Sequence, residues 1–159
     1  MPASYTLKRL GADDVPLLRA LNEMFGEAFK EPDTYTGAPP SDDYFKELLG
    51  NGDFVALVAL KDDQGEKNVI AGLAGYMLRK FERARAELFV YDLAVREGFR
   101  RQGIATAMLE ETRNIAAACG AYVVIIFADD GDEAPIAVYS RLGKMEKAVS
   151  FDIPVKANT

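Results

Sequence analysis

The stretch that decides the fold is Val90-Tyr91-Asp92-Leu93-Ala94-Val95, four further residues, and then Arg100-Arg101-Gln102-Gly103-Ile104-Ala105. Its first part is rich in β-branched and aromatic residues and predicts a strand. Its second part opens a helix to residue 118, because Ile104, Met108 and Ile115 recur near helical spacing. A turn that carries a glycine therefore stands between a strand and a helix N-terminus.

This turn is suited to an anion. The first N–H groups of a helix lack internal partners and carry a partial positive charge. Gly103 lets a pyrophosphate approach the main chain closely, and Arg100 and Arg101 add charge-assisted contacts. An ordinary capped helix whose arginines face solvent is the alternative, and the six-residue string alone fits both interpretations.

The whole chain predicts one mixed α/β domain over residues 1–159, without internal repeats. Strands are expected at residues 4–9, 54–60, 69–81, 86–95, 121–128 and 148–153. Helices are expected at residues 13–29, 41–49, 102–118 and 134–142. Residues 31–40 predict an irregular loop that can cover a substrate site. The apolar run at residues 121–128 suits burial on both faces and a parallel crossover.

Composition excludes several classes of function. The 159 residues are 49% hydrophobic, enough for a core, and the apolar runs are too short to span a membrane. Since a signal-peptide pattern is also missing, we expect a soluble cytoplasmic protein. Without histidine, neither a Ser-His-Asp triad nor a histidine-based metal site can form, and we expect no metal. The single Cys119 ends an apolar helical stripe and predicts a buried, inert thiol, with an acetyl-carrying nucleophile as the alternative.

The net charge of −6 disfavours a nucleic acid as partner and favours a cationic one. Solubility alone can also explain this charge. Four of the twenty-five acidic residues form a cluster after the strand at residues 121–128, at Asp129, Asp130, Asp132 and Glu133. Asp132 and Glu133 can simply cap the next helix, so Asp129 and Asp130 are the sharper candidates for binding a cationic substrate.

Three segments in order, Leu93-Ala94-Val95, Arg100-x-x-Gly103-x-Ala105 and Ala137-Val138-Tyr139-Ser140-Arg141-Leu142-Gly143, resemble the GNAT superfamily of N-acetyltransferases. The resemblance implies a central, mostly antiparallel sheet of six to seven strands with splayed middle strands, and about four helices. It also implies acetyl-CoA as donor, with its pantetheine arm along the main chain of Leu93, Ala94 and Val95. The pyrophosphate would be held by Arg100, Arg101, Gln102, Gly103, Ile104, Ala105 and Thr106.

Acetyl transfer to an amine needs a neutral nucleophile, a stabilised oxyanion and a proton for the departing thiolate. Tyr139 stands where similar enzymes place a tyrosine near the coenzyme sulfur, which implies a general acid; a packed aromatic is the alternative. Asp92 and Glu87 are the candidate bases on the strand before the turn, and a bulge could change which face each uses. We prefer Asp92, which can equally bind a cationic substrate. A backbone N–H near Val95 is the expected oxyanion donor.

A closer resemblance involves Tyr91-Asp92-Leu93-Ala94-Val95, the run from Arg100 to Thr106, and Gly120-Ala121-Tyr122-Val123. These resemble the GNAT-type aminoglycoside 3-N-acetyltransferases. The resemblance implies antibiotic resistance through acetylation of a 3-amino group by direct attack in a ternary complex, with Asp92, Asp129 and Asp152 as ammonium partners. It also allows a homodimer. The chain departs from that family at residues 30–32 and 62–68.

Two other functions stay open. A polyamine or other small-amine acetyltransferase would use the same machinery and explain the acidic residues equally well. A non-catalytic module that binds acetyl-CoA is of a different class, and Tyr139 together with Asp92 argues against it.

Overall fold

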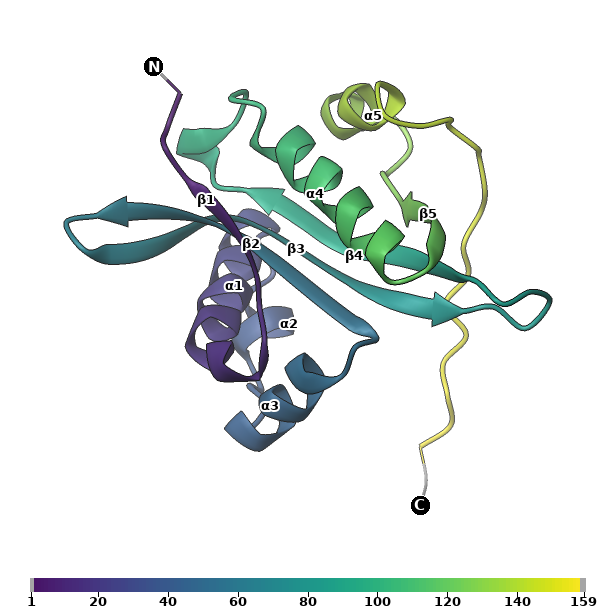
Figure 1. Cartoon of the computed structure of the whole chain (residues 1–159), viewed down its shortest axis with the longest axis horizontal. Coiled ribbons are helices and arrows are strands. Elements are labelled where there is room, and N and C mark those ends of the chain that lie inside the picture. Colours follow the sequence, from purple (N-terminus) through teal and green to yellow (C-terminus); the bar gives the residue numbers. More distant parts are fainter. Residues whose placement is uncertain (1, 158–159) are drawn as a thin grey trace. The chain divides into compact units, whose positions relative to one another are not determined.

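Five strands form one sheet, in the order β1-β2-β3-β4-β5, in the computed structural model, which describes residues 2–157 (Figure 1). Their bounds are β1 Thr6–Arg9, β2 Phe54–Asp63, β3 Glu66–Arg79, β4 Ala86–Val95 and β5 Ala121–Ile126. The pairs from β1 to β4 are antiparallel, and β5 runs parallel to β4. The mixed α/β order and the parallel crossover predicted from the sequence are therefore confirmed.

Helices cover both faces of this sheet (Figure 1). On one face lie α1 Val15–Ala28, α2 Pro32–Thr36 and α3 Asp42–Gly50, with the short 3-10 helix η1 Ala12–Asp14 before them. On the other face lies α4 Ile104–Ala118, preceded by the 3-10 helix η2 Glu97–Phe99. The start of α3 follows the sequence signal, because the Ser41 hydroxyl accepts a hydrogen bond from the Tyr44 N–H.

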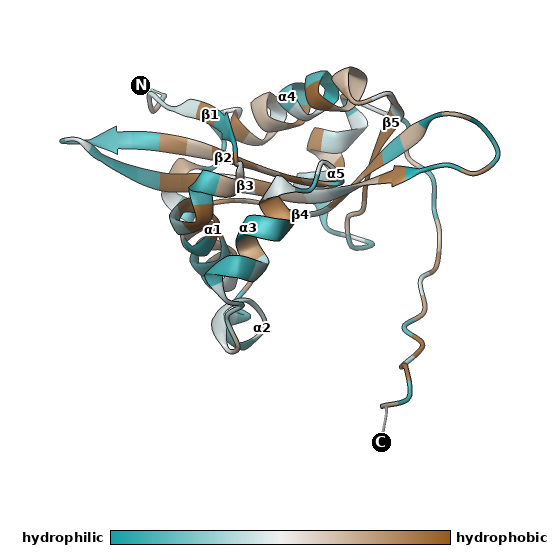
Figure 2. Ribbon diagram, turned by 60° about the horizontal axis from the view of Figure 1, so that its bottom comes forward, coloured by the Kyte–Doolittle hydropathy of each residue, from teal (hydrophilic) through white to brown (hydrophobic). Residues whose placement is uncertain are grey.

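The core on the first face joins α1 to the middle of the sheet. Leu18, Leu21, Met24 and Phe25 of α1 are buried against alternate residues of β2, among them Ala56 and Val58. The helix lies close to β3, since a Cβ added at Gly72 would be 1.9 Å from Leu21 Cδ1. Figure 2 shows the apolar colour in the middle of β2 and β3 and the polar colour at their hairpin. The middle strands are thus buried on both faces, as continuous apolar runs indicate.

The hairpin between β2 and β3 is longer than the sequence predicts. The predicted strands leave residues 61–68 between them, but β2 continues to Asp63 and β3 begins at Glu66. Gln64 and Gly65 both have positive φ, which is the backbone of a two-residue hairpin turn. The charged residues of this segment lie in solvent-exposed strand ends, so polarity alone did not mark the turn.

The chain divides into two compact units, one ending at Phe127 and the other beginning at Ala128. The second unit contains α5 Glu133–Ser140, close to the helix expected at residues 134–142. Gly143 follows the helix, and its N–H donates to the Tyr139 carbonyl oxygen at 2.9 Å. Each unit is considered by itself below.

Four expectations about secondary structure and burial are corrected. Residues 148–153 form no strand, so the described sheet has five strands rather than six to seven. A strand needs a partner for its backbone groups, and among residues 2–157 no strand pairs with this segment. The segment at residues 31–40 contains the helix α2, which begins at Pro32, where a helix tolerates proline. With α2, the described residues form five α-helices, where about four were expected.

The other two corrections concern exposure. β5 is an edge strand, and none of its residues is fully buried, contrary to the expected burial on both faces. Cys119 is exposed rather than buried, because α4 ends at Ala118 and Cys119 lies in the turn that follows. Within residues 2–157, no helix is long and apolar enough to cross a membrane.

Candidate functional site

A β-bulge at Tyr91 sets the orientation of the candidate base. In the β3–β4 register, Ala74 pairs with Asp92 and Gly75 with Val90, so Tyr91 is the extra residue. By alternation Asp92 would share a face with the buried Leu88 and Val90, but the bulge moves it to the opposite face. The in–out alternation of side chains along β4 therefore changes phase between Val90 and Asp92, as the sequence allowed.

The bulge depends on a close approach of the two strands at Gly75. A Cβ added there would lie 2.6 Å from the Phe89 carbonyl oxygen and 3.1 Å from the Val90 Cα, both main-chain atoms. Backbone atoms at such distances cannot rotate away as the end of a side chain can. Only glycine therefore fits at this position without moving β3 from β4.

Asp92 lies partly buried on this face and has one hydrogen-bond partner among the described residues. The Tyr35 hydroxyl, from α2, donates to Asp92 Oδ1 at 2.9 Å. Burial raises the pKa of Asp92 above its usual value, the Tyr35 hydrogen bond lowers it, and the Glu31 carboxylate raises it, with burial the largest effect. A carboxylate with a raised pKa is a stronger base than an exposed one, which is what proton removal from an ammonium group requires.

Glu87, the other candidate base, has different surroundings on the same strand. Its Oε1 accepts a hydrogen bond from the Tyr122 hydroxyl at 2.7 Å and lies 3.5 Å from Lys80 Nζ. The Arg85 guanidinium covers the Tyr122 ring at 3.8 Å. This carboxylate is therefore held in an ion pair and a hydrogen bond, whereas no cation of residues 2–157 pairs with Asp92.

Aromatic side chains lie next to Asp92 on the same face. The Tyr91 ring is 5.4 Å from the Tyr76 ring and 4.9 Å from the Phe89 ring, and Phe127 is 5.1 Å from Phe89. Tyr76, Tyr91 and Phe127 are 39%, 65% and 65% exposed, so their rings are open to a ligand. Aromatic faces of this kind attract ammonium groups.

The predicted pyrophosphate segment forms a tight turn before α4. Arg101 and Gly103 both have left-handed backbones, with φ of 61° and 79°, and Gly103 precedes the first residue of the helix. The N–H groups at the helix start, including those of Ala105 and Thr106, face no earlier turn of helix and can bind an anion. Ile104 is only 2% exposed, so its side chain belongs to the core and only its main chain is available to a ligand.

The side chains of this turn have their own contacts. Arg100 Nε donates to the Val95 carbonyl oxygen at 3.0 Å, which ties the turn to the end of β4. Gln102 Oε1 accepts from the Ala3 N–H at 2.9 Å, and thus fixes the N-terminal segment beside the turn. The Gln102 side chain therefore already has a partner within the protein. A coenzyme would have to bind the main chain of Gln102 or displace this hydrogen bond.

The sheet opens beside the expected pantetheine site. Pairing between β4 and β5 ends at Val90 and Ile126, while β4 continues to Val95. Leu93, Ala94 and Val95 are still paired with β3, and alternate main-chain groups of an antiparallel strand point to its other side. The main chain of this segment can therefore accept a further extended ligand, as an open sheet edge does.

The remaining predicted residues belong to the second unit. Tyr139 lies on α5, Asp129 and Asp130 precede that helix, and Asp152 lies in the segment without a strand. Burial and, to a lesser extent, the Asp132 carboxylate raise the pKa of Tyr139, so the phenol is protonated near neutral pH. Asp132 precedes α5 without a side-chain capping bond, and its main-chain oxygen accepts from the Ile136 N–H.

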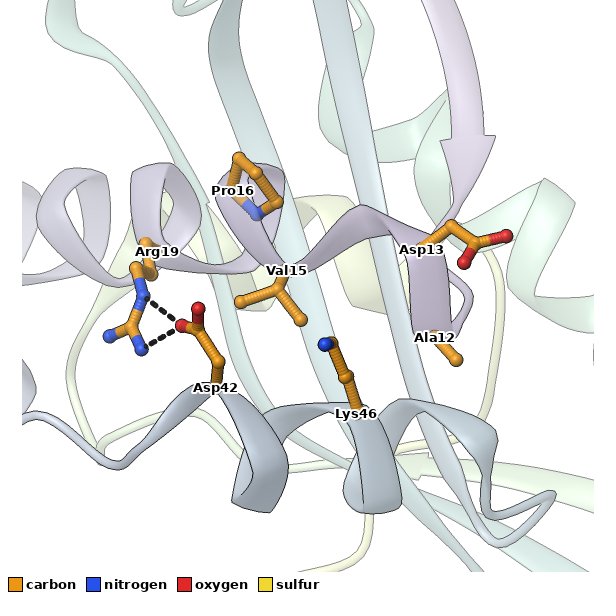
Figure 3. Close-up of a pocket in the computed structure, with 7 residues that line it drawn as sticks. All are labelled: Ala12, Asp13, Val15, Pro16, Arg19, Asp42 and Lys46. Carbon is orange, nitrogen blue, oxygen red and sulfur yellow. Dashed lines mark hydrogen bonds and ion pairs between the residues drawn. The ribbon is translucent and has the colours of Figure 1, made fainter.

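A pocket on the described surface lies elsewhere, between η1, the start of α1 and α3 (Figure 3). Arg19 pairs there with Asp42 at 2.6 Å and also donates to the Pro40 carbonyl oxygen. Figure 3 shows that these two charged side chains point toward one another. The hollow contains neither β4 nor the turn before α4, so we do not assign the coenzyme to it.

Sequence reasoning missed Tyr35, Tyr76 and Tyr91 as parts of the site. Tyr35 lies in a segment expected to be an irregular loop, and its partner Asp92 is far away in the sequence. Pro32 at a helix start was the available signal for α2. The sequence has no signal for the contact itself.

The profile of the acetyltransferase (GNAT) family matches residues 18–144. The chain belongs to this family of acetyltransferases, whose acyl donor is acetyl-CoA. No curated protein matches the chain significantly.

Among solved structures, the chain is similar to an aminoglycoside acetyltransferase, HMB0005, from an uncultured soil metagenomic sample. The two share 44% identity over 96% of this chain and 99% of that chain, with a TM-score of 0.89. Another aminoglycoside acetyltransferase, meta-AAC0020 from an uncultured soil metagenomic sample, in complex with sisomicin, shares 25% identity over 96% and 97%, with a TM-score of 0.82. A ribosomal-protein-alanine N-acetyltransferase from Brucella melitensis biovar Abortus 2308, 20% identical over 96% and 99% with a TM-score of 0.69, shows the shared fold.

Because β3 and β4 lie so close at Gly75, we expect a larger residue there to destabilise the protein. Gly75→Ala should lower the free energy of unfolding by about 1–3 kcal/mol, because the added methyl group meets main-chain atoms of β4. Gly52→Ala is the matched control, since a Cβ at Gly52 meets nothing within 4 Å. Urea unfolding followed by circular dichroism measures both variants, and equal stabilities would contradict the role of Gly75.

Proposed function

We propose that residues 1–159 act as a single acetyltransferase domain that transfers acetyl from acetyl-CoA to the 3-amino group of an aminoglycoside. The amine attacks directly in a ternary complex of enzyme, coenzyme and antibiotic. The main observation in support is Asp92, a partly buried carboxylate with a raised pKa, on the strand whose end leads into the turn before α4.

The proposed chemistry gives Asp92 and Tyr139 separate proton-transfer steps. Asp92 takes a proton from the acceptor ammonium group, and the neutral nitrogen then attacks the thioester carbon. A main-chain N–H near Val95 stabilises the oxyanion. As the C–S bond breaks, the Tyr139 hydroxyl gives its proton to the coenzyme thiolate. We assign the base to Asp92 rather than Glu87, because Lys80 and Tyr122 already hold the Glu87 carboxylate.

For the donor, we propose that the pantetheine arm lies along Leu93, Ala94 and Val95. The pyrophosphate would bind at residues 100–106, from Arg100 and Arg101 to Thr106, through main-chain N–H groups and the two guanidinium groups. The left-handed Gly103 and the helix start support this assignment. No metal has a part in the proposed reaction.

For the acceptor, we propose a molecule with several ammonium groups. Asp92 and the exposed rings of Tyr76 and Tyr91 would contact one of them, with Asp129, Asp130 and Asp152 as further partners. The net charge of −6 favours such a cation over a nucleic acid. The 44% identical relative, an aminoglycoside acetyltransferase, supports an aminoglycoside in particular.

We further propose that the reaction takes place in the cytoplasm, where acetyl-CoA is available, and that it confers antibiotic resistance. A homodimer is the assembly that we propose for the active protein.

A panel of acceptors tests the function. The purified protein with acetyl-CoA should release free thiol with sisomicin and gentamicin-like aminoglycosides, but much more slowly with spermidine or lysine peptides. NMR of the product should show the acetyl group on the 3-amino nitrogen. Turnover with spermidine alone would replace the aminoglycoside by a polyamine, and binding of acetyl-CoA without any turnover would indicate a non-catalytic module.

Gly103→Ala should weaken acetyl-CoA binding. The added side chain disfavours the φ of 79° by about 1 kcal/mol or more, which disturbs the N–H groups at the helix start. Gly120→Ala is a matched control, because Gly120 has the same φ of 79°, also has open space around it, and lies at the other end of α4. Calorimetry should show a higher Kd for Gly103→Ala only; an equal Kd in both variants would exclude the turn as the pyrophosphate site.

Tyr139→Phe should lower kcat by roughly 10²-fold or more, since the phenol no longer supplies a proton to the thiolate. The Kd for acetyl-CoA should change little, because the ring remains. Stopped-flow measurement of thiol release separates these two quantities. Unchanged kcat would leave Tyr139 as a packing residue.

A further inference from the structure

Tyr35 lies in a segment that two aromatic contacts and one close backbone approach hold in place. Its ring is 5.7 Å from the ring of Phe25 and 5.7 Å from that of Phe29, both at the end of α1 or just after it. The Glu31 N–H donates to the Gly26 carbonyl oxygen at 3.0 Å. The ring position is therefore fixed by α1 as well as by α2.

Gly26 sets how closely α2 lies against α1. A Cβ at Gly26 would be 3.3 Å from the Pro32 Cα and 3.6 Å from the Tyr35 Cβ. The first distance is tighter than ordinary contact, so a larger residue would push α2 outward. Glycine at this position lets the Tyr35 hydroxyl reach across to β4.

The Tyr35 hydroxyl binds one oxygen of the Asp92 carboxylate and leaves the other oxygen available to a ligand. The hydrogen bond goes to Asp92 Oδ1, and among residues 2–157 no donor to Oδ2 is found. Burial and the Asp92 carboxylate raise the pKa of Tyr35, so its hydroxyl is protonated near neutral pH and can donate to the ionised carboxylate.

We propose that Tyr35 is a positioning residue for the acetyl transfer, which fixes the Asp92 carboxylate so that its second oxygen receives the proton of the acceptor amine. This inference rests on the proposed function of Asp92. Tyr35 does not itself touch the reacting atoms; it acts through Asp92.

The charged and titratable groups around Asp92 determine how its pKa changes when the Tyr35 hydroxyl is removed. Tyr35 and Glu31 face Asp92 from the α2 segment, and Tyr76 faces it from β3. The Tyr35 hydrogen bond stabilises the ionised carboxylate and lowers its pKa, whereas burial and Glu31 act in the opposite direction. Removal of the hydroxyl should therefore raise the pKa of Asp92, so that the base is ionised only at higher pH.

Tyr35→Phe tests this inference while keeping the ring and its contacts with Phe25 and Phe29. NMR of protein labelled with ¹³C at the aspartate carboxyl groups should show the Asp92 titration moved to higher pH. The Asp92 signal is identified by its loss in Asp92→Asn. At pH 7, kcat with an aminoglycoside should fall about tenfold, as expected for the loss of a hydrogen bond to a charged group, while the Kd for acetyl-CoA stays the same.

Tyr122→Phe is the matched control, because it removes the same kind of hydrogen bond, from a tyrosine to Glu87 on the same strand. It should change neither the Asp92 titration nor kcat. A loss of kcat in Tyr122→Phe with none in Tyr35→Phe would overturn the inference and make Glu87 the base.

Two other results with Tyr35→Phe would also contradict the role of Tyr35 as a positioning residue. If the Asp92 titration in Tyr35→Phe equals that of the unmodified protein, the hydroxyl does not hold the carboxylate in solution. If the titration moves but kcat is unchanged, Tyr35 has no part in the reaction. Full activity of Asp92→Asn would instead disprove the proposed base, even where the titration shows that Tyr35 and Asp92 are paired.

Discussion

The extra residue at Tyr91 is the constraint on which the site depends. Without it, Asp92 would share the face of Leu88 and Val90, which are almost fully buried. An ionised carboxylate placed there without a partner would lose its hydration at a cost of several kcal/mol. The bulge turns the carboxylate to the face that α1 and α2 cover, where the Tyr35 hydroxyl compensates part of the lost hydration. Gly75 makes this possible, because its missing side chain lets the main chain of β3 follow the bulge.

The bulge at Tyr91 also divides β4 into two parts that differ in their pairing. Up to Val90 the strand pairs with β5 as well as β3, and beyond the bulge it pairs with β3 alone. The residues after Tyr91 therefore combine a carboxylate on one face with main-chain groups at an open edge. An amine and an extended thioester could both reach such a segment, which is the geometry that direct transfer requires. Val95 then connects to the turn before α4 through its bond with Arg100.

The sequence predicted the elements better than their contacts. The strand, turn and helix from Val90 to Ala118 were predictable, because apolar spacing and Gly103 mark them locally. It also allowed a bulge on β4, but not its position, since no local pattern distinguishes Tyr91 from its neighbours. The pair of Tyr35 and Asp92 depends on how α2 packs on α1, which is a tertiary contact. The strand predicted at residues 148–153 was wrong, because the residue types of a segment do not show whether another strand lies beside it to pair with its backbone groups.

The two tyrosine–carboxylate pairs on β4 contain the same kind of hydrogen bond, but the other groups around the two carboxylates differ. Glu87 accepts a hydrogen bond from Tyr122 and lies in an ion pair with Lys80, so its carboxylate already has two partners. Asp92 has Tyr35, a neighbouring carboxylate at Glu31, and partial burial. Burial and Glu31 raise the pKa of Asp92, and the Tyr35 hydrogen bond acts against that rise. As the base that we propose, Asp92 has to bind a proton more readily than an exposed carboxylate and still be ionised when the substrate arrives, and burial and the tyrosine hydroxyl act in these two opposite directions.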